Sequence, residues 1–146
     1  MGLGKVECEI ARYAKDFDIQ VFGIKRTSDG RSIPSVDEIF TRDELPQMLP
    51  NADFLTVSCP LTPETERPIG QKELEMRPTS SVLFNVSRGA VVDQRALAEA
   101  LKSGRLRGAA LDVFEIEPLP KRRPPIGYTE SNNQSSFSKH LPGREQ

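Results

Sequence analysis

The sequence predicts an α/β fold in which a parallel sheet is covered by helices on both of its faces. Short apolar runs alternate along the chain with segments of helical periodicity, and this alternation is typical of β-α-β units. The run over residues 81–86 is almost continuously apolar, as expected for a strand that is buried on both faces. The 146 residues suffice for one domain with its own core.

Four strands are expected from short apolar runs. They cover residues 19–24, 53–57, 81–86 and 108–114. Right-handed crossovers between parallel strands bring the carboxyl ends of all four to one edge of the sheet. Because open sheets of this kind bind their ligands beyond that edge, chemistry is expected at the turns that follow the strands.

Three helices are expected between these strands. The first covers residues 7–14, in which apolar residues recur at helical spacing. A short second helix lies around residues 74–76 and is closed by Pro78. In the third helix, Asp93 can serve as the N-cap and Gly104 as the C′ residue. Its apolar stripe consists of Leu97, Ala100 and Leu101.

The composition argues against partners that are recognised by charge. The formal net charge is −1, from 20 basic and 21 acidic residues, so neither nucleic acid nor an anionic membrane is an expected partner. No apolar run approaches the roughly 18 residues of a membrane-spanning helix, and the first residues do not resemble a signal peptide. Cys8 and Cys59 lie far apart and in no metal-ligand spacing. We interpret them as free thiols, expect no metal site, and expect a cytoplasmic location.

The chain changes character after Pro120. Residues 121–146 begin with a basic, proline-rich stretch and continue with serine, asparagine and glutamine without periodicity, so disorder is expected there. Residues 1–120 are therefore predicted to form the folded domain. The single histidine, His140, lies in this polar tail, and we expect a solvated side chain with no catalytic role.

A glycine turn opens the chain. Gly2 and Gly4 precede the first predicted helix, and such a turn brings backbone N–H groups to a pyrophosphate. Glu7 stands where a third glycine is usual, so its carboxylate would crowd the packing of helix on strand and repel phosphate. The strand that normally precedes the turn is absent. The sequence therefore predicts a Rossmann-like doubly wound sheet with its first strand missing; an ordinary flexible N-terminus is the alternative.

The residues after the first apolar run bear on the choice between NAD and NADP. NAD-specific proteins place an acidic residue about twenty positions after the glycine turn, where it meets the ribose hydroxyls. This chain has Lys25 and Arg26 there, and two cations suit a 2′-phosphate. The sequence therefore leaves NAD and NADP open and favours NADP slightly. A solvated basic turn is the alternative interpretation.

Three motifs follow one another along the chain in the order and spacing of a known family. They are CPLTPET at residues 59–65, NVSRGAVVD at 85–93 and GAALDVFEIEP at 108–118. Over about residues 2–120 the chain resembles the D-isomer-specific 2-hydroxyacid dehydrogenases, which include D-lactate, D-3-phosphoglycerate and glyoxylate/hydroxypyruvate enzymes. The resemblance implies NAD(P)-dependent oxidoreduction between a small 2-keto acid and a D-2-hydroxy acid.

The resemblance also implies a set of residues around the cofactor. The glycine turn would hold the pyrophosphate through Gly2, Gly4, Lys5 and Val6. Lys25 and Arg26 would meet the adenosine ribose. The other contacts would come from loops that follow the strands: Cys59, Pro60 and Thr65 at the adenosine end, and Val86, Ser87, Arg88 and Asp112 at the nicotinamide end.

Two residues are implied to act on the substrate. Arg88 would clamp its carboxylate with a bidentate guanidinium and polarise its carbonyl. Glu117 would pair with a catalytic histidine that exchanges a proton with the substrate oxygen. In the family that histidine follows an apolar strand and a proline, and His140 lacks this context. Arg88 as a surface arginine and Glu117 as an exposed acid are the structural alternatives.

The missing histidine and substrate domain lead us to expect little or no activity from this chain alone. Two other functions stay open. One is a non-catalytic dinucleotide sensor, as in the C-terminal-binding-protein corepressors, which resemble the same family; the other is a remnant without function. Relatives of this family are commonly dimers, so a homodimer is the expected assembly.

Overall fold

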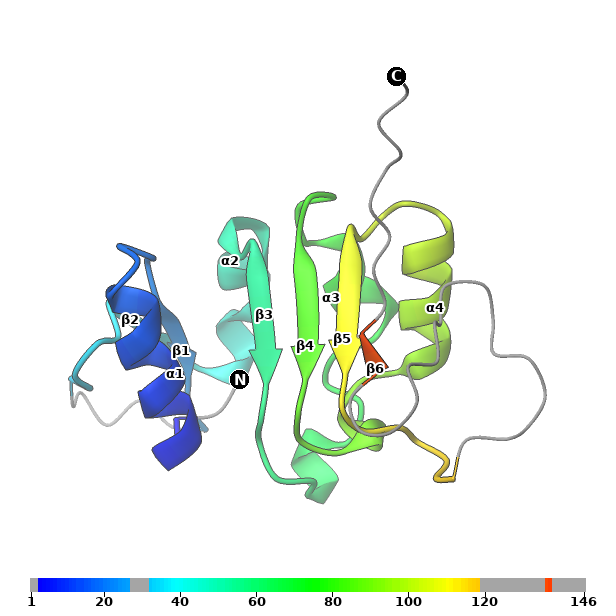
Figure 1. The fold of residues 1–146 in the computed structure, drawn as a ribbon, viewed down its shortest axis with the longest axis horizontal. Helices are drawn as coiled ribbons and strands as arrows, with labels where there is room; N and C mark the ends of the chain where they lie inside the picture. Colours follow the sequence, from blue (N-terminus) through cyan, green and yellow to red (C-terminus); the bar gives the residue numbers. More distant parts are fainter. Residues whose placement is uncertain (1–2, 27–31, 119–135, 138–146) are drawn as a thin grey trace.

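The computed structural model shows parallel strands with helices packed against them (Figure 1). It describes residues 3–26, 32–118 and 136–137. The helices and strands, in chain order, are α1 (Lys5–Lys15), β1 (Phe22–Ile24), β2 (Glu38–Phe40), α2 (Leu45–Met48), β3 (Phe54–Val57), α3 (Gln71–Glu75), β4 (Val82–Asn85), α4 (Gln94–Lys102), β5 (Gly108–Leu111) and β6 (Ser136–Phe137). Single turns of 3₁₀ helix are η1 (Arg42–Glu44), η2 (Leu49–Asn51), η3 (Pro63–Thr65) and η4 (Gly89–Val91).

The strands form two sheets. β1 pairs in parallel with β2, while β3, β4 and β5 pair in parallel and β6 joins β5 in the antiparallel sense. In the described part of the chain no strand lies between β1 and β3. A cavity of about 190 Å³ is found there instead, between α1, β1 and β3. In a doubly wound sheet the strand before the glycine turn occupies this central position. The α/β doubly wound fold is confirmed, and the missing first strand stays a prediction.

The core is built mainly on β3, β4 and β5. Leu83 in β4 and Val57 in β3 are fully buried, and Leu55 in β3 and Leu111 in β5 are nearly so. From α4, Leu97 packs into the same cluster. Burial alternates along β4, since Val82 and Phe84 stay partly exposed, so this strand is less completely covered than its sequence suggested.

Helix α4 begins and ends as its sequence predicts. The Asp93 carboxylate accepts a hydrogen bond from the Ala96 N–H at 3.0 Å, which satisfies one of the free donors of the first turn. Gly104 has a φ of +71° and follows the last turn. The N–H groups of Gly104 and Arg105 donate to the carbonyls of Leu101 and Ala100, the two bonds of a Schellman motif.

Several boundaries differ from the prediction. β1 begins at Phe22 rather than at residue 19, and β5 ends at Leu111 rather than at residue 114. Three elements were not predicted at all: β2, α2 and the two-residue strand β6 within the segment 121–146. Gly2 and His140 lie outside the described residues. The division of the chain at residue 120 stays a prediction.

Candidate functional site

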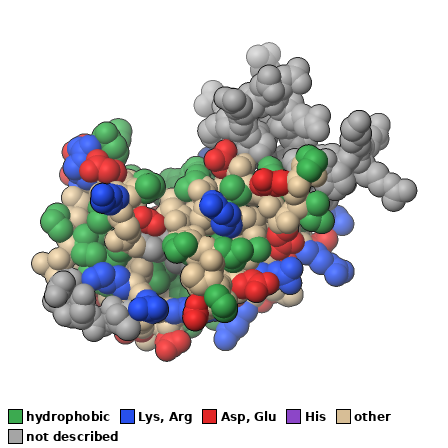
Figure 2. Space-filling model, turned by 90° about the horizontal axis from the view of Figure 1, so that it is seen from below, with side chains coloured by type: hydrophobic (Ala, Val, Ile, Leu, Met, Phe, Trp, Pro, Cys, Tyr) green, Lys and Arg blue, Asp and Glu red, His purple; other side chains and the backbone are tan. Residues whose placement is uncertain are grey.

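The pairing of β3, β4 and β5 brings their carboxyl ends together at one edge of the sheet. Val57 is the partner of Asn85, and Asn85 is the partner of Leu111, so each strand ends level with its neighbour. The chain leaves this edge through Ser58, Val86 and Asp112. Figure 2 looks onto this edge, where basic and acidic side chains lie interspersed among apolar and uncharged ones.

A cavity of about 550 Å³ lies at this edge, beside β1 and the loop after β3. It brings together five residues that the sequence analysis assigned to the adenosine end of a dinucleotide: Lys25, Arg26, Cys59, Pro60 and Thr65. Seven residues that were not predicted complete the lining: Leu3, Ile24, Arg42, Asp43, Thr62, Glu64 and Pro68. Leu3 directly precedes Gly4, so the cavity reaches to the glycine turn.

The loop after β3 is held in shape by Thr65. Its hydroxyl donates to the Pro60 carbonyl at 2.6 Å and accepts from the Thr62 N–H at 2.7 Å. Because these two bonds engage the hydroxyl within the loop, Thr65 shapes the wall of the cavity. Thr65 therefore lies at the predicted adenosine end, but its hydroxyl bonds within the loop.

Three cations face two carboxylates in this cavity. The cations are Lys25, Arg26 and Arg42, and the carboxylates are Asp43 and Glu64. The hydroxyl of Thr62 donates to Glu64 and is the main cause that lowers the pKa of this carboxyl, with smaller contributions from Arg26 and Arg42. Arg42 also donates to the backbone carbonyl of Glu64, which links η1 to η3 across the cavity.

The Cys59 side chain is a neutral thiol in the cavity wall. It is 6% exposed and forms no disulfide. Burial raises the pKa of the Cys59 thiol, because a thiolate would lose its hydration there. Contact with an apolar part of a ligand suits this group better than nucleophilic chemistry.

The turn after β4 is fixed by Asn85. The side-chain oxygen of Asn85 accepts hydrogen bonds from the Ser87 N–H at 3.1 Å and from the Ser87 hydroxyl at 2.9 Å. The Asn85 side-chain amide donates in turn to the Arg88 carbonyl at 3.1 Å. This network leaves Val86 47% exposed and the Arg88 side chain exposed at the edge. One Arg88 nitrogen, Nη1, donates to the carbonyl of Ser87 at 2.7 Å.

The segment after β5 lies beside this turn. The Asp112 N–H donates to the Asn85 carbonyl at 3.0 Å, and the Asp112 side chain is exposed. Further on, the Glu117 carboxylate accepts from the Phe114 N–H at 2.8 Å, so its orientation is fixed within its own loop. Both residues therefore lie on loops at the same edge as Arg88.

The glycine turn leads directly into α1. Gly4 is the N-cap residue, and Lys5 and Val6 are the first two residues of an 11-residue helix. Both side chains point into solvent, and Val6 is 59% exposed. A helix of this length presents free N–H groups and a positive dipole end at the turn.

Comparison with known proteins agrees with this arrangement. Residues 1–133 match the family model of the D-isomer specific 2-hydroxyacid dehydrogenase, NAD binding domain. The chain belongs to this family.

Relatives in the family are much longer than this chain. It is 36% identical over 129 residues to a D-3-phosphoglycerate dehydrogenase of Methanocaldococcus jannaschii, covering 85% of this chain and 23% of that protein. It is 38% identical over 126 residues to a glyoxylate reductase of Korarchaeum cryptofilum, covering 85% of this chain and 37% of that protein. A family enzyme of Xanthobacter autotrophicus Py2, solved with NADPH, matches with a TM-score of 0.77 and 37% identity, over 84% of this chain and 38% of that one.

Among the cavity-lining residues that the sequence analysis missed are two charged ones, Arg42 and Asp43. Both follow β2, which is short and was not recognised, so no strand end was expected there. A local signal does exist. Thr41 and Glu44 form a capping box, in which the Glu44 carboxylate accepts from the Thr41 N–H at 2.7 Å. Such a pattern after Ile39 and Phe40 indicates a strand followed by a helical turn.

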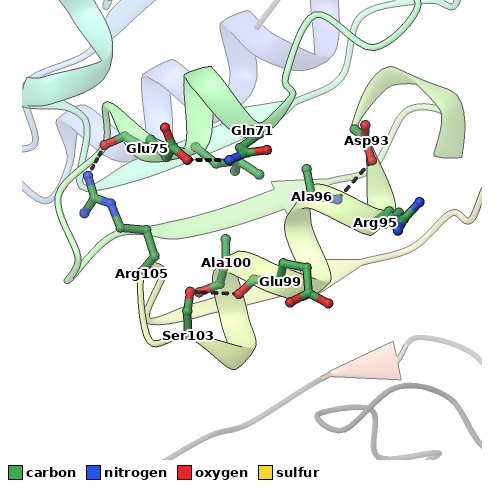
Figure 3. A pocket seen from close by; sticks show the side chains of 10 residues that line it. Gln71, Glu75, Asp93, Arg95, Ala96, Glu99, Ala100, Ser103 and Arg105 are labelled. Carbon is green, nitrogen blue, oxygen red and sulfur yellow. Dashed lines mark hydrogen bonds between the residues drawn. The ribbon is translucent and has the colours of Figure 1, made fainter.

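A second cavity, of about 480 Å³, lies between α3 and α4 and contains no predicted site residue (Figure 3). Its polar groups bond mainly to one another: Gln71 donates to the Glu75 carboxylate at 2.7 Å, and Arg105 donates to the Glu75 carbonyl. The first bond lies within α3, and the second ties the end of α3 to the segment after α4, which indicates a structural role. In the described ranges there is no metal-ligand cluster, and none of their helices could span a membrane.

Proposed function

We propose that this chain binds NADP(H) or NAD(H) at the carboxyl edge of its sheet, as the nucleotide-binding part of a D-2-hydroxyacid dehydrogenase. The observation that carries the proposal is the cavity that unites Lys25, Arg26, Cys59, Pro60 and Thr65. These residues come from two separate loops, and the sequence analysis assigned them to one ligand. The cavity volume also lies within the usual range for small-molecule sites, about 300–1,000 Å³.

The residues present fit such a dinucleotide. The adenosine would contact the apolar wall at Cys59 and Pro60, and the ribose would lie near Lys25 and Arg26. The diphosphate would meet the N–H groups of the glycine turn at the start of α1. The excess of cations at the ribose end supports NADP over NAD, because a 2′-phosphate adds negative charge at that point.

The nicotinamide would lie at the turn after β4, between Arg88 and Asp112. Once bound, it supplies or accepts the hydride that interconverts a 2-keto acid and a 2-hydroxy acid. Arg88 is exposed on a turn that Asn85 fixes, so its guanidinium can hold a substrate carboxylate in a defined orientation. Glu117 would orient a proton-donating histidine. A small 2-keto or 2-hydroxy acid is therefore the proposed substrate of the complete protein.

Titration with NADPH and NADH tests the proposal. The chain contains no tryptophan, so NADPH emission can be followed with little protein background. We expect enhanced emission and a higher melting temperature with NADPH, and weaker effects with NADH. The Arg26→Ala variant should reduce the NADPH response, whereas Arg95→Ala, at the other cavity, should not. A cooperative melt that neither nucleotide changes would contradict the proposal, and a chain with no cooperative melt would support the interpretation as a remnant.

Turnover by the chain alone is expected to be negligible. General acid catalysis contributes roughly 10²–10⁴ in rate, and Arg88 and Glu117 cannot supply that proton by themselves. Incubation with NADPH and glyoxylate or hydroxypyruvate should leave the absorbance of NADPH unchanged. Robust oxidation of NADPH would show that the chain carries its own proton donor.

Self-association is part of the proposal. Val6 and Tyr13 are 59% and 57% exposed and lie two turns apart along α1. An exposed apolar stripe of this kind is typical of a surface that contacts another protein. Light scattering should give the mass of a dimer, and Tyr13→Glu should shift it toward the monomer.

A further inference from the structure

The side chain of Glu7 folds back over the beginning of α1. One carboxylate oxygen, Oε1, accepts a hydrogen bond from the Ser58 hydroxyl at 2.8 Å. The other, Oε2, lies 2.9 Å from the point that a Cβ on Gly4 would occupy. The carboxylate is thus held between the glycine turn and the residue that follows β3.

The same chain shows what a glutamate does at this position of a helix. Glu73 is the third residue of α3, after Gly70 as N-cap, just as Glu7 is the third residue of α1 after Gly4. The Glu73 carboxylate accepts from the Gly70 N–H at 3.0 Å and so satisfies the free end of its helix. A carboxylate at this position acts as an internal anion at the positive end of the helix.

In α1 this anion stands where a diphosphate has to bind. A dinucleotide places its diphosphate at the N-terminus of the helix after the glycine turn, and the pattern normally has glycine at position 7. The Glu7 charge also extends to the cavity, since it adds to the burial that raises the pKa of the Cys59 thiol. Two negative groups would therefore share one helix end.

We propose that Glu7 limits the affinity of this chain for dinucleotides, because its carboxylate, anchored by Ser58, repels the diphosphate at the start of α1. This inference rests on the proposed function. It names a residue of this chain that sets how tightly the cofactor is held, and it predicts that removal of one charge strengthens binding.

The Glu7→Gln variant tests this directly. A glutamine can still accept the Ser58 hydrogen bond, so the change removes the charge and keeps the shape. We expect the Kd for NADPH to fall about threefold to tenfold. The Ser58→Ala variant keeps the charge but releases the carboxylate, and we expect a smaller decrease in Kd. Thermal melts establish whether each variant is folded. If Glu7→Gln does not fold, the Kd of Ser58→Ala is the test.

Two control variants remove a charge elsewhere. Glu9 lies on the same helix, pairs with Arg12 at 3.1 Å and has a side chain that is 64% exposed. Glu73 has the equivalent capping position in α3. Glu9→Gln and Glu73→Gln should leave the Kd for NADPH within about twofold of the wild type, because the Glu9 charge is exposed and screened and the Glu73 charge caps a different helix. An equal gain in Glu9→Gln would overturn the inference.

A control ligand separates the diphosphate from the rest of the cofactor. Adenosine 2′-monophosphate carries the adenine and the 2′-phosphate without the diphosphate. Glu7→Gln should bind it no more tightly than the wild type does. If the wild type binds NADPH and Glu7→Gln does not bind it more tightly, the inference fails and the proposed function stands. If neither protein binds NADPH, both fail.

Discussion

Gly89 lies so close to Phe114 that a Cβ at position 89 would be 1.9 Å from the Phe114 carbonyl carbon. The amide nitrogen of Glu115 would be only 2.2 Å away. Since these atoms belong to the backbone, no rotation of a side chain could relieve the clash. Gly89 follows Arg88, and Phe114 donates its N–H to Glu117. This close approach therefore packs the turn of Arg88 against the loop of Glu117.

The Gly89→Ala variant should lose stability. The added methyl group must push residues 114–115 away, and overpacking of this kind typically costs about 1–3 kcal/mol. We expect a loss near the upper end, because the obstacle is the backbone. Urea unfolding monitored by circular dichroism measures the change in the free energy of unfolding.

Gly108 offers a matched control for this substitution. It opens β5, and a Cβ there would meet no atom within 4 Å. Gly108→Ala should change the free energy of unfolding by less than about 1 kcal/mol, because the methyl group enters open space. Equal unfolding midpoints for the two variants would contradict the interpretation of the Gly89 contact.

Arg77 carries a buried charge that its surroundings satisfy only in part. It is 1% exposed, and its Nη2 donates to the Val82 carbonyl at 2.8 Å. Within the described residues Nε and Nη1 have no hydrogen-bond partner. Burial lowers the pKa of Arg77 to about 10, and Asp53 offsets this only partly. The folded state therefore retains a large desolvation penalty at this position.

The Arg77→Met variant should be more stable than the wild type. Methionine keeps most of the side-chain volume and removes the buried charge, a change that is often neutral or stabilising by about 1–4 kcal/mol. The lost bond to the Val82 carbonyl offsets about 1 kcal/mol of this gain. Thermal melts of Arg77→Met and of Arg95→Met, where the arginine is exposed, provide the comparison. A lower melting temperature for Arg77→Met would show that Nε and Nη1 of Arg77 are hydrogen-bonded in the wild type.

The sequence predicted best those elements whose signals are local. The ends of α4 were predicted because Asp93 and Gly104 have side-chain and backbone properties that suit a cap whatever packs against them. Strands β3 and β4 were predicted to within one residue, because their apolar runs end at polar or proline-rich turns. Such signals need no knowledge of the neighbouring strands.

The boundaries that the prediction missed depend on partners far away in the chain. β2 has only three residues and contains the exposed Glu38; it is a strand because its backbone pairs with β1. β1 begins at Phe22, where that pairing begins, and Ile19 stays 40% exposed. β5 ends at Leu111 because the following chain turns to meet Gly89. Only β2 is followed by a local signal, the capping box of Thr41 and Glu44.

In the candidate site too, some residues could be predicted from local motifs and others depend on distant pairing. The motif residues Cys59, Pro60 and Thr65 could be assigned to the adenosine end from their resemblance to a family, and they do line one cavity with Lys25 and Arg26. The roles of Arg88, Asp112 and Glu117 stay predictions, since no ligand contact tests them. Arg42 was missed because β2, whose end places it at the cavity, was not recognised.

Acid should destabilise the contact between α1 and the start of β2. The Lys15 ammonium donates to both Asp37 oxygens at 2.8 and 2.7 Å, and the Val21 N–H donates at 2.7 Å. The bond from Lys15, followed by that from Val21, lowers the pKa of Asp37 below its ordinary value of 3.8. The carboxylate therefore stabilises the fold above about pH 4, and this contribution is lost as the pH falls through the lowered pKa.

The Asp37→Asn variant isolates this contribution. At neutral pH it should melt at a lower temperature than the wild type, because it lacks the ionised carboxylate. In strong acid the two melting temperatures should converge, since the wild-type carboxyl is then protonated. Lys15→Met removes the first cause of the shift and should reduce the difference. A gap between wild type and Asp37→Asn that stays constant with pH would contradict the assignment.

Arg42 should favour NADPH over NADH. It faces the same cavity as Lys25 and Arg26, and a 2′-phosphate there would accept a charge-assisted hydrogen bond from its guanidinium. Loss of such a bond typically costs about 1.5–3 kcal/mol, so Arg42→Ala should weaken NADPH binding at least about tenfold. NADH has no 2′-phosphate, and its binding should weaken less than about twofold. Because Arg42 also donates to the Glu64 carbonyl, its loss could loosen the loop and weaken both nucleotides equally. Equal weakening would assign Arg42 to the shape of the cavity and not to selectivity. The measurement is the Kd of each nucleotide for Arg42→Ala, with Arg95→Ala as the control.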